Sequence, residues 1–422
     1  MTMTLAPTVS KDNTYGFSPE EEALRERIRS LAQTEFAPRA AVADRTGEFP
    51  WANLRRLAEE GFIGINIPKE YGGGGLGAVA HTIVTEEIAR ADAATAVIFE
   101  VHNTLCTDAI VRFGTAEHKV AYVPKLAELE WLGAFALTEP GAGSDPASQQ
   151  TRAVWTPNGE GTVASGAGTG EARDGFYVLN GEKTFITSAG QADLYIVTAV
   201  TGVAGALPAE RATRQPLLLP ARRISAFLVR KGTPGLSFGK PFHKMGLAAS
   251  HTAPLILDNV RVPVSDRLGG EGDGIKIALT VLDSGRIGIA AQSLGIARAA
   301  FERALAFAKE RVQFGRPVAQ HQAIQWKLAD MAMAIDASAL LTYRAARLRD
   351  AGARCSKEIA MAKLNASRTA NMVTNAAQEI MGARGYMEEY GLERLVREAR
   401  VTEIYEGTSE IMKLVISGAL LR

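Results

Sequence analysis

A glutamate near the C-terminus has neighbours that suit acid–base chemistry. The segment Tyr405-Glu406-Gly407-Thr408-Ser409-Glu410 places Glu406 between an aromatic residue and a glycine, at the start of the last predicted helix. An apolar pocket would raise the pKa of this carboxyl group by desolvation and make it a usable base. Alternatively, Glu406 is an acid at a helix N-terminus that interacts favourably with the helix dipole. The residues alone leave both interpretations open.

A turn-forming segment in the middle of the chain offers a second kind of chemistry. Residues 136–145, ALTEPGAGSD, combine hydroxyl side chains with a proline and two glycines. Such a turn exposes successive backbone N–H groups, which together with the Thr138 and Ser144 hydroxyls could hold a phosphate or the edge of a flavin. An ordinary turn between two domains is the alternative.

Other motifs do not support their usual functions. Residues 72–77 contain the spacing GxGxxG but lack a βαβ context, and the glycine-rich residues 166–170 lack the Lys-Ser/Thr of a P-loop. The six histidines have no metal-ligand spacing, and the chain has no GxSxG segment. We therefore expect no Rossmann-type site, no metal centre and no hydrolytic nucleophile.

Composition limits the class of protein. The chain has 422 residues, 46% hydrophobic and 22% charged, with a formal net charge of +1. This length predicts about two to three domains, and the charge balance argues against nucleic acid as a partner. The only cysteines, Cys106 and Cys355, are too distant in sequence for a disulfide framework. With no signal-like N-terminus or long apolar run, we expect a cytoplasmic protein without a membrane span.

The elements that must position the candidate residues fall into three consecutive parts. Helical periodicity dominates residues 17–134, beginning with the capping box Ser18-Pro19-Glu20-Glu21, after a flexible tail over 1–16. Residues 135–264 contain short β-branched and aromatic runs, and Asn180-Gly181 between two of them predicts a hairpin in an antiparallel domain. Residues 265–422 predict a helical bundle, and long loops are expected at about 156–174 and 201–223. The predicted bundle helices are roughly 272–311, 320–350, 356–381 and 407–421.

Six motifs in the same order resemble those of the acyl-CoA dehydrogenases. They are residues 136–145, 179–181 with 185–187, 244–246, 258–263, 311–315 and 405–410, and the resemblance covers the chain from about residue 17 to its end. Residues 282–290, LDSGRIGIA, look most like the short-chain, butyryl-type branch. The family fold is α+β: an N-terminal all-α domain, a central antiparallel β-barrel or sandwich domain and a C-terminal four-helix bundle. This order agrees with the one predicted from the residues.

The resemblance implies an enzyme that uses FAD to oxidise a short- to medium-chain or branched acyl-CoA to the trans-2-enoyl-CoA. Glu406 would remove the α-proton while a hydride leaves the β-carbon for flavin N5. Fixed donors must then meet the enolate oxygen, and these are expected to be the Glu406 backbone N–H and a flavin ribityl hydroxyl. An electron-transfer flavoprotein would accept the electrons.

The resemblance also implies a set of binding residues. FAD contacts within one subunit are expected from Phe135, Leu137, Thr138, Ser144, Phe185, Ile186, Thr187, Thr408 and Glu410. Contacts to the FAD of a neighbouring subunit are expected from Arg311, Phe314, Gln322, Glu379, Gly382 and Ala383. The acyl-CoA would be touched by Ser144, Asp283, Arg286, Tyr405 and Gly407. Shared FAD sites imply a homotetramer built as a dimer of dimers.

Several residues depart from the family pattern. Phe185 replaces a common Trp, Ala383 replaces a Gly, and Ala248 replaces a common Arg. Glu379 replaces a Gln, and a carboxylate near a diphosphate is unfavourable unless a cation such as Arg384 compensates it. Gly285 stands where other branches keep their base, which favours Glu406 in that role.

An unusual polar pair, Glu100 and His102, is expected at the end of the acyl pocket. The pair could recognise a functional group on the acyl tail, or it could form an outward-facing salt bridge. No Lys or Arg lies between Arg90 and Arg112, which argues against a substrate with a distal carboxylate.

Two rival functions remain from the sequence. One is an acyl-CoA oxidase or flavin monooxygenase of the same fold, and the retained Glu406 argues against the monooxygenase. The other is a non-catalytic scaffold or CoA-binding protein.

Overall fold

The computed structural model describes residues 15–157, 175–203 and 222–421. The predicted tail therefore lies outside the described residues except for Tyr15 and Gly16, and most of both predicted long loops also lies outside them. The first described residue, Tyr15, does not extend away from the protein: its ring stacks on that of Tyr343, with the centroids 5.7 Å apart.

The N-terminal part is helical, as predicted. Ser18 caps α1 and exchanges both hydrogen bonds of the capping box with Glu21. The main elements are α1 (Pro19–Leu31), η1 (Ala32–Phe36), α2 (Ala37–Thr46), α3 (Trp51–Glu59), α4 (Ala78–Ala91), α5 (Ala93–Glu100), η3 (Val101–Thr107), α6 (Asp108–Phe113) and α7 (Ala116–Ala127). All residues of α5 and η3 are buried. This continuous segment therefore runs through the interior, where it can line a site.

The central part is one twisted sheet. Its strands are β1 (Gly133–Ala136), β2 (Arg152–Pro157), β3 (Gly175–Thr187), β4 (Leu194–Val203), β5 (Arg222–Arg230), β6 (Leu236–Phe238), β7 (Thr252–Pro263) and β8 (Arg267–Leu268). The order is β6-β7-β3-β2-β4-β5-β8, with β1 beside β4. The pairing is mainly antiparallel, as expected, but β4 pairs in parallel with both β1 and β2.

The hairpin predicted at Asn180-Gly181 is wrong. Strand β3 continues through both residues, and its pairing with β7 shifts register between Leu179 and Gly181. A Cβ at residue 181 would lie 2.5 Å from Thr151 Oγ1, so glycine permits close approach of β2 rather than a turn. The side-chain oxygen of Asn180 accepts a hydrogen bond from Asn259 N, 2.8 Å away, which fixes the irregularity.

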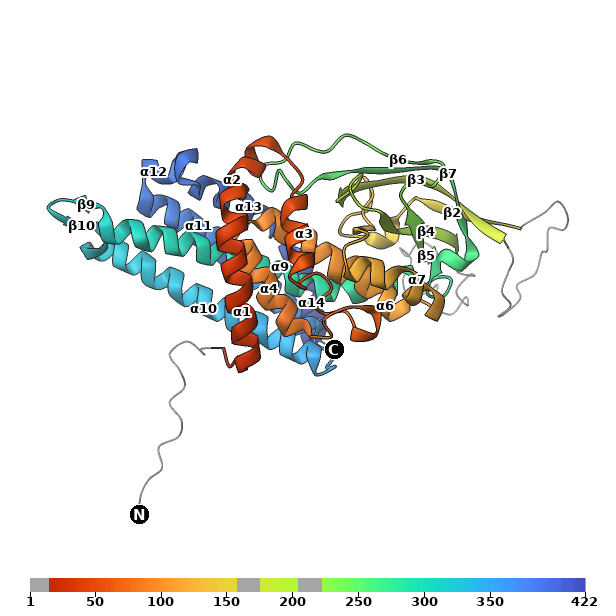
Figure 1. Ribbon diagram of the computed structural model, residues 1–422, viewed down its shortest axis with the longest axis horizontal. Helices are drawn as coiled ribbons and strands as arrows, with labels where there is room; N and C mark the ends of the chain where they lie inside the picture. The colour runs from red at the N-terminus through yellow and green to blue at the C-terminus, as the bar shows by residue number, and fades with distance from the viewer. Residues whose placement is uncertain (1–14, 158–174, 204–221, 422) are drawn as a thin grey trace, which may run out of the picture.

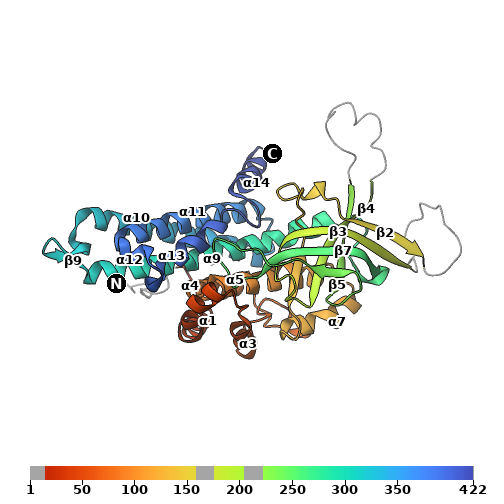
Figure 2. The same ribbon diagram turned by 90° about the horizontal axis from the view of Figure 1, so that it is seen from above.

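The C-terminal part is the predicted bundle. It contains α9 (Gly274–Glu310), α10 (Gln322–Asp350), α11 (Ser356–Met381), α12 (Ala383–Tyr386), α13 (Leu392–Val401) and α14 (Ser409–Leu420). The short hairpin of β9 (Val312–Gln313) and β10 (Arg316–Pro317) joins α9 to α10. It lies at one end of the long axis of the molecule, and the large sheet lies at the other (Figures 1 and 2).

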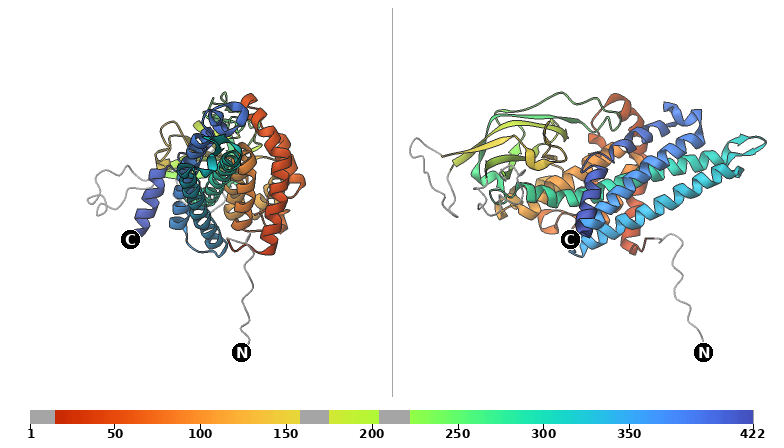
Figure 3. Two further views of the ribbon diagram at one scale, coloured as in Figure 1. Left: turned by 90° about the vertical axis from the view of Figure 1, so that its left-hand side faces the viewer. Right: turned by 180° about the vertical axis from the view of Figure 1, so that it is seen from behind.

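Helix α9 connects the three parts. It is 37 residues long and packs against α4, α5, α10, α11 and α13. Seen along the long axis, α1 lies on one flank of this bundle and α14 on the other (Figure 3). Buried Ile287 and Leu294 of α9 join the core formed with Ile83 and Val84 of α4. The site residues carried by α9 are therefore held by a rigid element.

None of the helices in the described part of the chain is long and apolar enough to cross a membrane.

Candidate active site

Glu406 lies in the link between α13 and α14, outside the last helix. The N-cap of α14 is Thr408, whose side chain accepts a hydrogen bond from Ile411 N. Glu406 has φ 51° and Gly407 has φ 103°, so both residues adopt left-handed backbone conformations. A non-glycine residue in this region is strained and is held there by its surroundings. The carboxyl group of Glu406 points towards α5 and α9, which does not support its being only a helix N-terminal acid.

Two cations hold consecutive carbonyl groups within this strained link. Arg286 Nε donates to the carbonyl oxygen of Glu406 at 3.0 Å, and Lys363 Nζ donates to that of Gly407 at 2.7 Å. Arg286 is itself held by Asp283, with 3.0 Å between Nη1 and Oδ1. With these carbonyls turned towards α9 and α11, no acceptor among the described residues takes the N–H of Glu406. That donor is available to a ligand.

The preceding side chain is fixed as well. Tyr405 donates its hydroxyl hydrogen to Gln292 of α9, and Gln292 Nε2 donates to the carbonyl oxygen of Ala93 at 2.8 Å. This chain of bonds ties the link to the start of α5. Charge-neutral hydrogen bonds of buried groups specify geometry because each unmade bond is costly.

Burial governs the acidity of the base. Glu406 is partly exposed as a residue, but its Oε2 atom is buried and has no conventional donor. Desolvation raises the pKa of Glu406, while a hydrogen bond from Glu100 and the charges of Lys363 and Arg286 oppose the rise. A Cβ at Gly285 would overlap Glu406 Oε2, so only glycine leaves room for the carboxyl group there.

Glu100 and His102 do not form the expected polar pair, and neither faces outward. Both are buried. The carboxyl group of Glu100 lies beside that of Glu406, next to Gly285 of α9. His102 Nδ1 accepts from Gly133 N at 2.9 Å, so its Nε2 carries the hydrogen donated to the carbonyl oxygen of Leu126, also at 2.9 Å. The histidine therefore joins η3 to β1 and α7, and only Glu100 belongs to the site.

Most residues predicted to contact the flavin within one subunit come from two adjacent segments, the end of β3 and β1 with the turn after it, which a hydrogen bond from Thr184 N to Thr138 O joins at 2.8 Å. Phe185 has φ 57° and is 63% exposed, with its ring centroid 5.1 Å from that of Phe242. Such an exposed, strained aromatic pair offers a flat apolar surface. Ile186 is buried beside it in β3. On β1 and just beyond it lie the other expected contacts, Phe135, Leu137 and Thr138.

The turn that follows β1 leaves its backbone open. Glu139 and Ala142 bond each other through N–H and C=O at 3.0 and 3.1 Å, which closes the turn. Beside Gly141 and Gly143 there is no heavy atom within 4 Å of where a Cβ would stand, and Ser144 is exposed. The turn therefore presents backbone and a hydroxyl to a ligand, as a phosphate or flavin edge requires.

A buried lysine that the sequence analysis missed supports this turn. Lys183 of β3 is fully buried, and its Nζ donates to Leu137 O at 3.0 Å, Glu139 Oε1 at 2.8 Å and Gln149 Oε1 at 2.7 Å. Glu139 in turn accepts from the backbone N–H groups of Gln150 and Thr151. Burial lowers the pKa of Lys183 to about 8, against the opposing charge of Glu139. The sequence contains a signal for this buried cation, because Lys183 lies inside a segment of strand-forming residues, now β3.

The second group of predicted FAD residues lies far from the first. Arg311 ends α9 and Phe314 forms the β9–β10 tip, where it is 94% exposed with φ 53°. Gln322, Glu379, Gly382 and Ala383 are also exposed and belong to the same end of the bundle, opposite the sheet (Figure 1). The predicted FAD residues thus form two clusters, and the two clusters lie far apart within one subunit.

The cation that pairs with Glu379 is Lys327 of α10 rather than the suggested Arg384. The Arg384 guanidinium lies over the rings of Phe307 and Tyr390, at 5.8 and 5.9 Å from their centroids. The negative charge near the predicted diphosphate is therefore balanced from the neighbouring helix.

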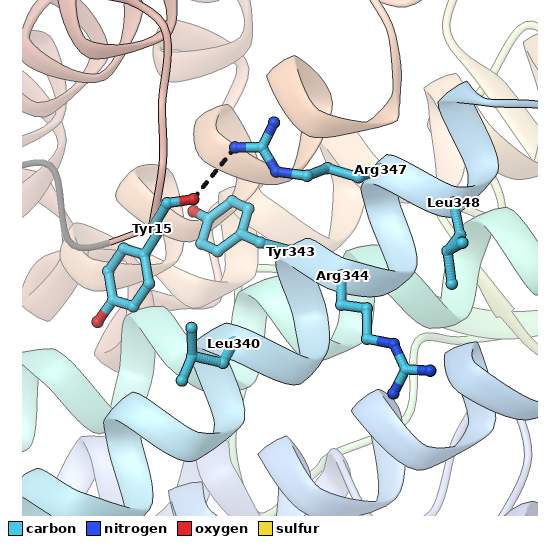
Figure 4. A pocket seen from close by; sticks show the side chains of 6 residues that line it. All are labelled: Tyr15, Leu340, Tyr343, Arg344, Arg347 and Leu348. Carbon is cyan, nitrogen blue, oxygen red and sulfur yellow. Dashed lines mark hydrogen bonds between the residues drawn. The ribbon is translucent and has the colours of Figure 1, made fainter.

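A surface hollow elsewhere on the molecule is not part of this site. It lies along α10 near the first described residues, and Tyr15, Leu340, Tyr343, Arg344, Arg347 and Leu348 line it (Figure 4). Arg347 crosses its edge and donates to Tyr15 O at 3.2 Å. None of the predicted catalytic or binding residues lines the hollow. Within the described ranges, no cluster of His, Cys, Asp or Glu could hold a metal ion.

Comparison with known families decides what this arrangement is. Models of the acyl-CoA dehydrogenase N-terminal, middle and C-terminal domains match residues 18–130, 134–260 and 272–421. The chain belongs to the acyl-CoA dehydrogenase family. It is an FAD-dependent oxidoreductase that acts on acyl-CoA, and the predicted α+β fold is confirmed.

Similar proteins cover almost the whole chain. An acyl-CoA dehydrogenase of Bacillus subtilis is 44% identical over 95% of this chain and 98% of its own length. The butyryl-CoA dehydrogenase of Megasphaera elsdenii is 38% identical with a TM-score of 0.85, over 96% of this chain and 99% of that one. A chain from the structural study of the electron transferring flavoprotein of Acidaminococcus fermentans is 39% identical with a TM-score of 0.86, at 96% and 99% coverage.

Lys363 was also missed from the sequence. On α11 it shares a buried face with Ile359, Ala366 and Ala370, at the three- and four-residue spacing of a helix. A lysine in such an apolar stripe is a signal for a buried, partnered cation. The apolar stripe can be recognised in the sequence, but the partner of Lys363, the Gly407 carbonyl, cannot be predicted from it.

Proposed function

We propose that this acyl-CoA dehydrogenase oxidises short- to medium-chain or branched acyl groups and that Glu406 is its base. The observation that carries this proposal is the buried carboxyl group of Glu406 next to a backbone N–H that has no acceptor among the described residues. When bound, FAD supplies the acceptor for the hydride that leaves the β-carbon. The similarity to the butyryl-CoA dehydrogenase of Megasphaera elsdenii supports the short-chain assignment.

Removal of the α-proton needs help from the backbone. A thioester α-proton is too weakly acidic for a carboxylate unless a preorganised donor meets the developing enolate oxygen. The N–H of Glu406 is such a donor, because no acceptor among the described residues takes it, while Arg286 and Lys363 hold the two carbonyls that follow. Exclusion of water from the carboxyl group raises its basicity and strengthens the bond to the oxyanion.

The residues present fit FAD. The exposed ring of Phe185 gives a flat apolar contact, and the open turn with Gly141, Gly143 and Ser144 offers donors for polar groups. The predicted contacts from Phe135, Leu137, Thr138, Ile186 and Thr187 come from β1, the residues just after it and the end of β3. Thr408 and Glu410 stand at the start of α14, next to Glu406.

Sharing of FAD between subunits remains part of the proposal. The set around Arg311 and Phe314 lies at the β9–β10 end of the long axis, whereas the first set is carried mainly by β1 and β3 of the large sheet, so one subunit does not present both sets to one ligand (Figure 2). An exposed phenylalanine at a hairpin tip is suited to a partner surface. We therefore propose an obligate homotetramer, organised as a dimer of dimers, in the cytoplasm.

The proposed electron acceptor is an electron-transfer flavoprotein. The similarity to a chain studied with the electron transferring flavoprotein of Acidaminococcus fermentans supports this choice. Rapid reoxidation of the reduced enzyme by dioxygen, with release of peroxide, would favour the oxidase alternative instead.

One experiment tests cofactor, reaction and substrate together. The purified protein is mixed anaerobically with a series of acyl-CoA thioesters, and the bleaching of flavin absorbance is followed. We expect yellow protein and the fastest bleaching with short straight or branched chains. If the protein retains no flavin after reconstitution, or if none of the acyl-CoA thioesters bleaches its flavin, the CoA-binding alternative is supported.

A further inference from the structure

Two carboxyl groups meet inside the active site. Glu100, the last residue of α5, is fully buried, and its carboxyl group lies beside that of Glu406 next to Gly285 of α9. A Cβ built at Gly285 would overlap Glu406 Oε2 and would lie 3.1 Å from Glu100 Oε1. At Gly288, one helical turn on, a Cβ would overlap Glu100 Cγ. The two glycines of α9 thus border the space that both carboxyl groups occupy.

The bonding pattern requires a proton between these groups. Among the described residues, no conventional donor reaches the buried Oε2 atom of either Glu100 or Glu406. Two ionised carboxylates would leave both oxygens unsatisfied and would repel each other away from water. A single shared proton makes one group the donor to the other and leaves the pair with one negative charge.

The surrounding charges place that proton on Glu100. The cations that face the pair, Lys363 from α11 and Arg286 from α9, act on Glu406 and favour its ionised form. In the part of the chain that the structure describes, the side chain of Glu100 accepts only the hydroxyl hydrogen of Thr104, from η3, while Tyr405 donates its hydroxyl hydrogen to Gln292. Burial and the negative charge of Glu406 raise the pKa of Glu100 well above its ordinary value.

We propose that Glu100 is a positioning residue: as a carboxylic acid it donates a hydrogen bond to Glu406 and holds the base in its ionised, substrate-facing state. The inference rests on the proposed role of Glu406. When Glu406 takes the α-proton, the C–H bond breaks and an O–H bond forms on Glu406. The electron pair of the C–H bond stays on the substrate. The pair then holds two protons and no charge, and release of one proton restores it.

Two variants of Glu100 separate this role from simple packing. In Glu100→Gln the amide oxygen can accept from Thr104 and the amide nitrogen can donate to Glu406, whereas Glu100→Ala removes the donor. We expect the acid limb of the pH dependence of anaerobic flavin reduction to move up by about one pH unit or more in Glu100→Ala, since a hydrogen bond to a charged group is lost. Glu100→Gln should stay close to the native profile. Unchanged limbs in both variants, or equal shifts in both, would overturn the proposal.

Infrared spectroscopy gives a readout that does not need turnover. At about pH 8, well above the ordinary pKa of glutamate, the native holoenzyme should show the carbonyl band of a buried protonated carboxyl group. Glu100→Gln should lose this band. The matched control is Glu87→Gln, which removes an equally buried glutamate ion-paired with Arg29 and Arg90, and it should keep the band. Melting temperatures show that each variant is folded.

The outcomes keep the two proposals distinct. If Glu406→Gln reduces flavin normally, Glu406 is not the base, whatever the infrared spectra show. If Glu406→Gln is inactive but the band persists in Glu100→Gln, the base assignment stands and the shared proton is overturned.

Discussion

Lys363 Nζ lies 2.7 Å from the carbonyl oxygen of Gly407, the residue that follows the proposed base. This buried lysine and Arg286 each fix one carbonyl of the link between α13 and α14. The link has a strained backbone at Glu406, with φ 51°, and such a conformation persists only where neighbouring bonds enforce it. The cations therefore do more than balance the charge of Glu406, because they also hold the two peptide groups that follow it.

Glu406→Gln removes the base and keeps the shape of the side chain. We expect it to retain FAD and to bind acyl-CoA, while flavin reduction falls by at least ~100-fold, as is typical for loss of a positioned base. Stopped-flow absorbance under anaerobic conditions measures the reduction, and a ligand titration measures binding. Reduction at a near-native rate would show that another group takes the proton.

Lys363→Met tests the backbone clamp. The variant loses the bond to Gly407 O and a positive charge near Glu406, so we expect flavin reduction to slow by about 10-fold or more, in line with loss of a group that supports oxyanion stabilisation. FAD content should be unchanged. Lys357→Met removes a more exposed lysine from the start of the same helix, with 35% side-chain exposure, and serves as the control.

Helical periodicity was enough to predict the bundle helices, but the contact between α5 and α9 could not be predicted from the sequence. The predicted helix 356–381 matches α11 at both ends, because capping and apolar spacing are local properties. Glu100 belongs to a helix with apolar residues on all faces, so no periodicity indicates which way its carboxyl points. Its position follows from close packing against Gly285 and Gly288, which are almost 190 residues away in sequence.

The error at Asn180-Gly181 has a similar cause. This dipeptide is a strong hairpin signal on its own. Here, Thr151 of a separate segment approaches so closely that glycine is needed inside a continuous strand. Tertiary packing therefore overrides the local signal. By contrast, the order of the site motifs along the chain was enough to assemble the site around Glu406, because the family fold supplies the long-range contacts.

Lys183→Met should weaken both the fold and cofactor retention. Lys183 and Glu139 are buried at 0% and 4% side-chain exposure, so removal of the lysine leaves an uncompensated buried carboxylate at a cost of about 3–5 kcal/mol. The turn that follows β1 also loses its support. Denaturant unfolding of the apoprotein measures the first effect, and FAD dissociation measures the second.

The same lysine predicts a pH dependence of stability. Its pKa is lowered from 10.5 to about 8 in the folded protein, so between these pH values the unfolded chain binds more protons than the folded one. The contribution of Lys183 to the free energy of unfolding therefore rises with pH across this window. Denaturation series at several pH values should show that the free energy of unfolding rises less with pH for Lys183→Met than for the native chain. Parallel curves would show that Lys183 keeps its ordinary pKa.

Arg311→Ala tests whether the distant set of residues holds FAD. If Arg311 contacts the cofactor of a neighbouring subunit, its loss removes a cation near the diphosphate, and we expect FAD affinity to fall by about 10-fold or more. The tetramer, measured by light scattering with and without FAD, should also be less stable. Unchanged affinity and assembly would argue against shared sites.

Lys327→Met tests the charge balance at Glu379. The native pair is an ion pair between α10 and α11, with side-chain exposures of 38% and 66%, so its loss should hardly change the stability of the subunit. It would instead leave the Glu379 carboxylate uncompensated near the diphosphate of the proposed shared FAD, and we expect weaker FAD binding. Glu379→Gln in the same chain should restore the affinity, because it removes the repulsive charge. Isothermal titration of FAD into the three apoproteins decides the matter: if Lys327→Met binds FAD as tightly as the native chain, Glu379 does not face the cofactor.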